Sequence, residues 1–142
     1  MNLNIYGGFF RNKRILITGN TGFVGAYLSL TLSMMGSKIL GYSLKKKDKK
    51  YLSNTKEYKK QIKTIYDDIS EISSHKQYIK AFKPQILIHL ASQPILSRSY
   101  IDSRKTYETN VMGTVKLLEI ARELKSLKNI LVFTSDKVYI NT

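Results

Sequence analysis

A glycine-rich turn between an apolar strand pattern and an apolar helix pattern constrains this chain more than any other feature. The β-branched run 14–18 precedes the turn, residues 23–35 follow it with helical character, and glycines recur at Gly19, Gly22 and Gly25. In such a strand–turn–helix unit the first glycine allows a tight turn, the second lets the backbone approach a pyrophosphate, and the third lets the helix pack closely. Glycines at turns often serve the turn alone. The flanking patterns favour a dinucleotide-binding site, with the helix N-terminus facing the phosphates.

The rest of the chain alternates strand and helix patterns, which predicts a parallel sheet with helices on both faces. Strands are predicted at 14–18, 37–42, 61–66, 86–91 and 129–134, and helices at 23–35, 70–82 and 103–125. Residues 44–60 are predicted to form a loop with at most one helical turn. Right-handed crossovers then give the strand order 3-2-1-4-5, with the third strand at an edge. Because the order reverses between strands 1 and 4, we expect a crevice beyond their carboxyl ends.

Composition narrows the functional classes. The chain has 142 residues, which is room for one domain, and it lacks cysteine, which excludes disulfides, thiolate metal ligands and a cysteine nucleophile. His75 and His89 are far apart, and no cluster of His, Asp and Glu has the spacing of a metal site. The sequence contains no signal-peptide pattern and no membrane-spanning run, so we expect a soluble cytoplasmic protein.

The formal net charge of +14 raises the question of a nucleic-acid partner. Much of this charge lies in the lysine-rich stretch 45–63, and such runs are usually solvated surface. Tyrosines lie nearby, but no RNA-binding signature or helix-turn-helix pattern accompanies them. We therefore expect no specific nucleic-acid partner, only weak charge-driven adhesion at low salt.

Four stretches resemble the extended short-chain dehydrogenase/reductase superfamily, whose members work on nucleotide sugars. They are residues 18–25, 89–94, 107–115 and 134–139. The last three are similar to CDP-glucose 4,6-dehydratases, and a Ser-Asp-Lys triplet in the last stretch replaces the Thr-Asp-Glu of related dehydratases. The resemblance covers nearly all of the chain. It implies an α/β fold with a Rossmann-type doubly wound parallel sheet, truncated after strand 5.

The resemblance implies a dehydratase reaction with NAD as a recycled hydride carrier and CDP-glucose as substrate. Hydride leaves carbon 4 of the hexose, water is lost across carbons 5 and 6, and hydride returns to carbon 6 to give CDP-4-keto-6-deoxyglucose. By the same resemblance, Ser135 hydrogen-bonds the 4-hydroxyl, Asp136 protonates the departing 6-hydroxyl, and Lys137 acts as base or stabilises the enolate. Asn110 is the residue whose backbone distortion organises the site, and Gln93 contacts the substrate.

The resemblance also assigns cofactor contacts around the glycine turn and the neighbouring strand ends. They are Gly19, Asn20, Thr21, Gly22, Phe23, Val24, Gly25, Ser43, Asp68, Ile69, Leu90, Ala91, Ser92 and Thr109. Asp68 would accept a hydrogen bond from the adenine amino group, and an aspartate that opens the next helix explains it nearly as well. Ser43 follows strand 2, where an acidic residue usually holds the ribose, so NADP stays open beside NAD.

Some of these residues also have a purely structural interpretation. Asp136 and Lys137 could form an exposed ion pair, and Asn110 could be a surface residue of its helix. His89 ends a buried strand, so we expect a satisfied core residue rather than a base.

The family's Tyr-x-x-x-Lys pair belongs on the helix after strand 5, and residues 1–142 end before that helix. The family's C-terminal substrate-binding region is also missing from these residues. We therefore expect an incomplete NAD(P)-binding domain, inactive alone and homodimeric when full length. Two other functions stay open: a nucleotide-sugar epimerase or reductase of the same superfamily, and a non-catalytic nucleotide-binding module.

Overall fold

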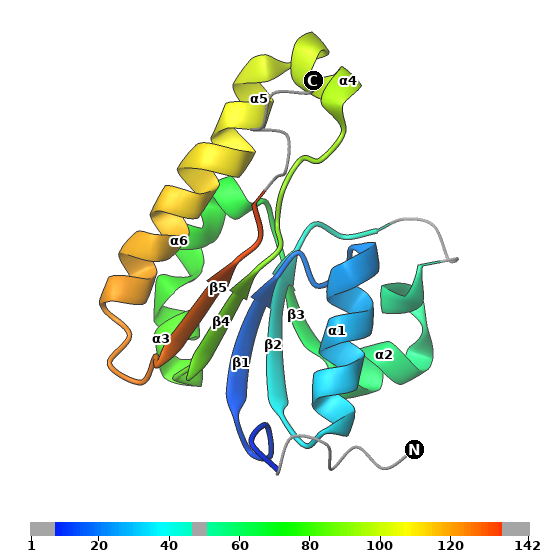
Figure 1. Cartoon of the computed structure of the whole chain (residues 1–142), viewed down its shortest axis with the longest axis vertical. Coiled ribbons are helices and arrows are strands. Elements are labelled where there is room, and N and C mark those ends of the chain that lie inside the picture. The colour runs from blue at the N-terminus through cyan, green and yellow to red at the C-terminus, as the bar shows by residue number, and fades with distance from the viewer. Residues whose placement is uncertain (1–7, 47–50, 135–142) are drawn as a thin grey trace, which may run out of the picture.

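The computed structural model describes residues 8–46 and 51–134, which form one parallel five-stranded sheet flanked by helices (Figure 1). The strands are β1 (Arg14–Thr18), β2 (Lys38–Ser43), β3 (Lys63–Tyr66), β4 (Ile86–His89) and β5 (Asn129–Val132). Their order is β3-β2-β1-β4-β5, which confirms the predicted order and the edge position of the third strand. The fourth strand ends two residues earlier than predicted, because the N–H of Ala91 donates to the Thr18 side chain rather than to a neighbouring strand.

Helices connect the strands on both faces of the sheet. The α-helices are α1 (Phe23–Met34), α2 (Lys56–Gln61), α3 (Lys76–Phe82), α4 (Leu96–Ile101), α5 (Ser103–Tyr107) and α6 (Gly113–Arg122). Two 3₁₀ turns, η2 (Leu52–Asn54) and η3 (Ile69–His75), and a π-helical turn, η4 (Glu108–Met112), complete the described elements.

The helix prediction for 70–82 was wrong in its first half. Residues up to His75 form the 3₁₀ turn η3, and Asp68 is its N-cap because the Asp68 carboxylate accepts a hydrogen bond from the Ser70 N–H at 3.0 Å. α3 then ends at Lys83, which adopts a left-handed conformation (φ 53°) directly before Pro84. The proline cannot continue a helix and disfavours a right-handed helical conformation at the residue before it.

Two further predictions needed correction. The segment 44–60 is more than a loop, since it contains η2 and most of α2, which begins where the Thr55 hydroxyl accepts from the Tyr58 N–H at 3.3 Å. The helix predicted over 103–125 is interrupted by the π-helical turn and ends at Arg122. A short helix that the sequence did not predict, α4, precedes it.

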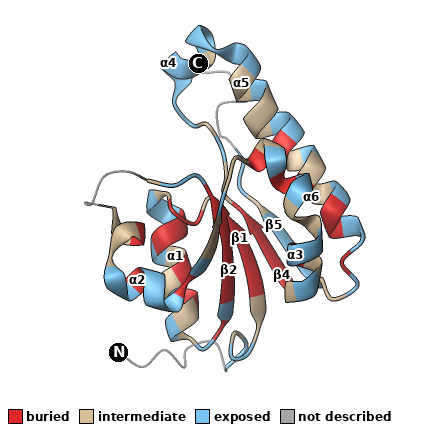
Figure 2. Ribbon diagram, turned by 180° about the vertical axis from the view of Figure 1, so that it is seen from behind, coloured by how far each residue is buried: buried red, intermediate tan, exposed pale blue. Residues whose placement is uncertain are grey.

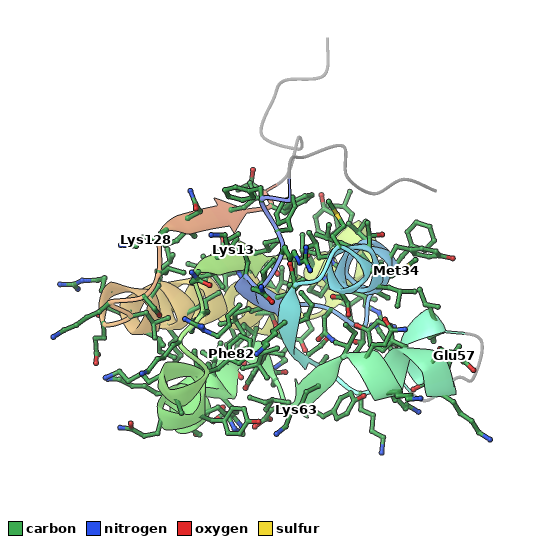
Figure 3. All side chains as sticks on the ribbon, turned by 90° about the horizontal axis from the view of Figure 1, so that it is seen from below. Lys13, Met34, Glu57, Lys63, Phe82 and Lys128 are labelled. Atoms are coloured by element: carbon green, nitrogen blue, oxygen red, sulfur yellow. The ribbon has the colours of Figure 1, made fainter. Side chains whose placement is uncertain are left out.

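Two helical layers sandwich the sheet, as the view from below shows (Figure 3). Alternation along β1 sends Ile15 and Ile17 to the face covered by α1 and α2, where they join a cluster with Ala26. Leu16 points to the opposite face and belongs to a cluster with Leu117 of α6. The central strands are therefore the most buried part of the molecule (Figure 2).

β5 is the exposed margin of this sheet. It pairs with β4 on one side, and no strand among residues 8–46 and 51–134 pairs with its other side. Ile130 and Leu131 are both about half exposed, at 47% and 50%. An apolar strand with an unpaired edge is a template for pairing with another chain.

We expect the 142-residue chain to self-associate through β5, more strongly as salt screens its positive charge. Light scattering between about 0.05 and about 0.5 M salt should show a rising mean mass, across the range where the Debye length shortens several-fold. Leu131→Lys should suppress the rise, because charge on an edge strand blocks edge pairing. Tyr27→Lys adds the same charge on α1 and should not; equal suppression by both variants would contradict the edge contact.

Candidate functional site

The turn between β1 and α1 depends on its glycines for two physical reasons. Gly19 has a positive φ of 73°, and a Cβ atom there would lie 2.7 Å from the carbonyl carbon of Leu90. A Cβ atom on Gly25 would collide with the carbonyl oxygen of Gly19, so only glycine lets α1 pack this closely. Gly22 is different, since its Cβ atom would meet only the Gly19 carbonyl oxygen, at 3.3 Å. Gly22 therefore borders open space, not packed protein.

The first turn of α1 has unsatisfied hydrogen-bonding capacity. Its N-cap is Gly22, which offers no side-chain cap, and no acidic residue lies in the first turn. Phe23 and Val24 begin the helix with exposed side chains. The carboxyl ends of the strands and the start of α1 lie on the same side of the molecule, at the upper end of the sheet in Figure 1. The N–H groups and positive dipole end of α1 are thus available to an anionic group at this edge.

The other polar residues of the turn point inward. Asn20 is fully buried, and its Nδ2 donates to the Tyr58 hydroxyl at 3.0 Å and to Thr64 Oγ1 at 2.8 Å. The Thr21 hydroxyl donates to the Leu44 carbonyl oxygen at 2.8 Å and lies 2.8 Å from Ser43 Oγ. These side chains shape the turn from beneath, so any cofactor contact at residues 20 and 21 runs through their backbone.

Asp68 and Ile69 lie beyond β3, where the adenine contact is predicted. Asp68 accepts from the Ser70 N–H and pairs with Lys105 Nζ at 2.9 Å. Burial raises the pKa of the Asp68 carboxyl, but these hydrogen bonds outweigh burial and hold the pKa below its usual value. The interpretation of Asp68 as a helix-opening cap is confirmed, and Ile69 is a core residue packed against Gly113. Their contact with adenine stays a prediction.

Asn110, in the π-helical turn η4, contacts Gln93, and both residues are assigned to the site. Asn110 Oδ1 accepts from the Gln93 N–H at 2.7 Å, and Asn110 Nδ2 donates to the Gln93 carbonyl at 3.1 Å. Asn110 lies inside η4, so its backbone departs from α-helical geometry, and its role in organising the site stays a prediction. Thr109 beside it is half-buried, and Ser92 is exposed. Asn110 thus fixes the chain that follows β4, and the roles of these residues in chemistry stay predictions.

Ser135, Asp136 and Lys137 lie outside the described residues. The structure follows the chain to Thr134, two residues beyond β5, at the same edge of the sheet as the glycine turn. The assigned contacts Leu90 and Ala91 lie directly beside Gly19 at that edge.

His89 occupies the junction of β1 and β4. Its Nδ1 lies 2.6 Å from Thr18 Oγ1 and its Nε2 lies 2.8 Å from Thr114 Oγ1. Only 3% of the residue is exposed, and burial lowers the pKa of the imidazole. The expectation of a satisfied core histidine is confirmed.

Two residues that sequence reasoning missed hold the site together. Tyr58 bonds both the side chain and the carbonyl of Asn20, although it lies within the lysine-rich segment. Thr114 bonds His89 and, through its hydroxyl, the Asn110 carbonyl at 2.7 Å. The sequence signals for Thr114 are its place in the stretch 107–115 and its position four residues after Asn110, about one helical turn away.

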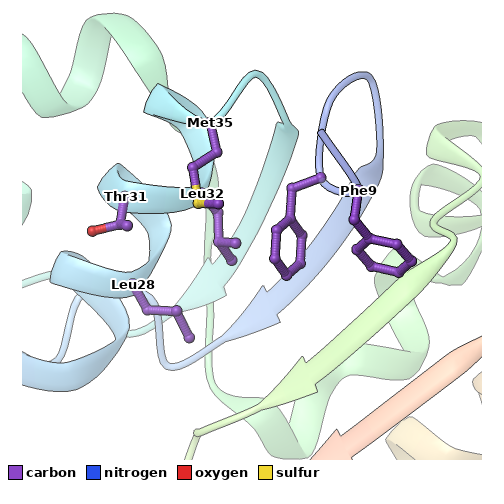
Figure 4. Close-up of a pocket in the computed structure, with 6 residues that line it drawn as sticks. Phe9, Leu28, Thr31, Leu32 and Met35 are labelled. Atoms are coloured by element: carbon purple, nitrogen blue, oxygen red, sulfur yellow. The ribbon is translucent and has the colours of Figure 1, made fainter. Parts of the chain in front are cut away.

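A separate apolar pocket of about 570 Å³ lies between the C-terminal half of α1 and the turn that precedes β1 (Figure 4). Its lining comprises Phe9, Phe10, Leu28, Thr31, Leu32 and Met35. With a single hydroxyl for polar contact, it lacks the groups that a dinucleotide needs. The described residues also contain no cluster of three metal-binding side chains and no helix long and apolar enough to cross a membrane.

Residues 16–139 match the protein family described as GDP-mannose 4,6 dehydratase. The chain belongs to this family. Within the GDP-mannose 4,6 dehydratase family, the chain is similar to CDP-glucose 4,6-dehydratase of Salmonella typhimurium, with 38% identity over 133 residues. It is also similar to human dTDP-D-glucose 4,6-dehydratase, with 30% identity over 140 residues. The matches cover 94% of this chain in both cases but only 37% and 38% of the relatives, so this chain corresponds to their N-terminal part.

Solved structures support the same fold for this member of the GDP-mannose 4,6 dehydratase family. The epimerase Mth375 of Methanothermobacter thermautotrophicus aligns with a TM-score of 0.79 and 25% identity, over 91% of this chain and 37% of that one. UDP-glucose 4-epimerase of Brucella ovis, solved in complex with NAD, aligns with a TM-score of 0.73 at 23% identity, over 89% and 37% of the two chains. The second likeness shows the fold alone.

The buried His89 predicts a pH dependence of stability. Because burial lowers its pKa in the folded state, the unfolded chain takes up the proton first as pH falls below about 6.5. Stability from this group is complete above about pH 6.5 and declines on acidification, by at most about 1.4 kcal/mol per pH unit for one proton.

Denaturant unfolding between about pH 5 and 7, which spans the ordinary histidine pKa, should reveal this slope. His89→Gln supplies a donor and an acceptor without a titrating group, so it should flatten the slope. His75 is present in both proteins and cancels in the comparison. Equal slopes for the two proteins would show that His89 does not carry the effect.

Proposed function

We propose that this chain is the N-terminal, cofactor-binding portion of a nucleotide-sugar 4,6-dehydratase that acts on CDP-glucose with NAD. The observation that carries the proposal is the start of α1, which has no side-chain cap, borders open space at Gly22 and lies at the same edge of the sheet as the carboxyl ends of the strands. The 38% identity to CDP-glucose 4,6-dehydratase supports the reaction and the substrate.

The glycine turn fits a dinucleotide on physical grounds. Backbone N–H groups at the start of α1 would bind the pyrophosphate, since the N-cap residue Gly22 has no side chain to cap them. Leu90 and Ala91 would contact the same cofactor, because their backbone borders Gly19. When bound, NAD supplies a hydride acceptor that later returns the hydride to the same sugar.

NADP is the alternative cofactor. The Ser43 side chain faces Thr21, and the described residues directly after β2, 44–46, include no carboxylate to hold a ribose 2′-hydroxyl. Lysines lie instead beside this strand end, around a hollow of about 620 Å³. Its lining comprises Lys45, Lys46, Asn54, Thr55, Lys56, Glu57 and Lys59. This positive charge would suit a 2′-phosphate, so measured affinities for the two dinucleotides decide between them.

In the proposed reaction Ser135, Lys137 and Asp136 act on protons of the sugar. Ser135 hydrogen-bonds the 4-hydroxyl of the sugar and orients it. Oxidation at carbon 4 would pass a hydride to NAD and the 4-hydroxyl proton to the tyrosine of the family's Tyr-x-x-x-Lys pair, whose helix residues 1–142 do not include. The resulting ketone acidifies the hydrogen on carbon 5, and Lys137 would accept this proton or stabilise the enolate that forms. Asp136 protonates the oxygen on carbon 6, which leaves as water. Asn110 clamps the Gln93 backbone and so orients the substrate-facing segment.

An epimerase of the same superfamily is the second candidate function, favoured by the alignment with Mth375. The product separates the two candidates, since an epimerase retains the 6-hydroxyl that a dehydratase removes as water.

We also propose that the full-length enzyme is a homodimer, joined through the continuous stretch α5–η4–α6. Tyr107, Val111 and Val115 follow one another at helical spacing, and all three are exposed apolar side chains. Such a stripe is typical of a helix–helix contact.

Gly22→Val should abolish measurable NAD binding while leaving the fold intact. A valine side chain at Gly22 would project into the space proposed for the pyrophosphate, where the protein itself offers only one close contact. Calorimetry should show at least about a tenfold weaker affinity, equivalent to about 1.4 kcal/mol. Thr31→Val, at the far end of α1, is the matched control and should bind as wild type does. Equal affinities in wild type and Gly22→Val would remove the site from the glycine turn.

Asp136→Asn tests the chemistry in the complete gene product, including whatever the gene encodes after Thr142. Loss of the acid should slow water elimination by about 10²- to 10⁴-fold and leave the first oxidation largely intact. Reduced cofactor or a 4-keto-hexose should therefore accumulate, visible by absorbance and mass spectrometry. Asp102→Asn, on an exposed helix cap, is the control. A full dehydratase rate in Asp136→Asn would exclude the acid role.

A further inference from the structure

The π-helical turn that carries Asn110 requires something to hold it in place. A π turn is rare and is retained where its irregular backbone serves a site. Here the Asn110 carbonyl accepts a hydrogen bond from the Thr114 hydroxyl at 2.7 Å. The same hydroxyl lies 2.8 Å from His89 Nε2, on β4. The turn is thus attached to the centre of the sheet through two side chains.

The donors and acceptors of this cluster fit together in only one way. A carbonyl has no proton, so the single proton of the Thr114 hydroxyl is committed to Asn110. Thr114 Oγ1 must then accept from His89, which places the imidazole proton on Nε2. His89 Nδ1 becomes an acceptor, and the Thr18 hydroxyl donates to it at 2.6 Å.

The hydrogen bonds of Thr18 are consistent with the same direction of donation. Its Oγ1 accepts from the N–H groups of Leu90 and Ala91, each at 3.2 Å, so its own proton is free for His89. Protonation of His89 would turn Nδ1 into a second donor and leave the Thr18 proton without this acceptor. The arrangement therefore requires a neutral imidazole, and the burial of His89 favours that form.

We propose that His89 and Thr114 are positioning residues, which hold the π-helical turn through the Nε2–H tautomer of His89. The consequence reaches the crevice through Asn110, whose side chain bonds both the N–H and the carbonyl of Gln93. A continuous set of hydrogen bonds thus runs from β1 through β4 to the segment after β4. The inference rests on the proposed function only for the statement that Gln93 contacts a nucleotide sugar.

Packing alone does not account for this cluster. Apolar side chains would fill the same space without the desolvation cost of one imidazole and two hydroxyls. The polar groups fix the relative orientation of the side chains, because each hydrogen bond can form in one orientation only. A fixed orientation is what a site needs if it must hold a backbone segment within a fraction of an ångström.

Nitrogen-15 NMR of the 142-residue chain at pH 7 reads the tautomer of His89 directly, without any ligand. We expect a protonated Nε2 and an unprotonated Nδ1. In Thr114→Val, which keeps the size of the side chain, we expect amide exchange at Gln93 to accelerate at least about tenfold, by loss of one hydrogen bond that supports its clamp. Thr114→Ser restores the hydroxyl and should restore slow exchange, whereas Thr31→Val is the remote control.

A proton on Nδ1, or an imidazolium at pH 7, would overturn the proposal. So would unchanged exchange at Gln93 in Thr114→Val. Both measurements are independent of cofactor binding. A chain that shows the expected tautomer and exchange but does not bind NAD would keep this inference and remove the proposed function instead.

Discussion

The close approach of two backbones, at Gly19 on one side and Leu90 and Ala91 on the other, determines the geometry of this edge of the molecule. Two neighbouring parallel strands can end at the same edge only if the backbone segments that follow them do not collide. The glycine makes room for the chain leaving β4, and Thr18 binds its first two N–H groups. The glycine turn and the segment through Gln93 then leave the sheet in different directions, which is where a parallel sheet offers a ligand its crevice.

Much of the fold could be predicted because local signals agreed with one another. The apolar run 14–18, the glycines after it and the helical pattern from Phe23 are compatible with one supersecondary unit, and the observed order of strands follows from that unit and right-handed crossovers. The helix boundaries were less predictable, since capping by Asp68 and Thr55 competes with apolar periodicity over only a few residues.

The candidate site was predictable only where backbone shape decides the residue type. Gly19 is required by its positive φ, and Gly25 is required because a Cβ atom there would collide with the carbonyl oxygen of Gly19, six residues earlier. Both reasons are local, so the spacing of the glycines in the sequence is enough to predict them. Asn20 was different, because its partners Tyr58 and Thr64 lie 38 and 44 residues along the chain. The cluster around His89 likewise joins residues from three separate elements, and no local pattern encodes the proton order among them.

The burial of Asn20 against Gly41 has a consequence for how this protein can change over time. Any side chain at position 41 would occupy the volume of the Asn20 amide, since Gly41 presents its face directly to that group. A larger residue at one position is therefore acceptable only together with a smaller one at the other. Because the Tyr58 hydroxyl bonds both the side chain and the carbonyl of Asn20, position 58 is coupled to the same pair. Substitutions at 20, 41 and 58 should accordingly be inherited as a group across related sequences.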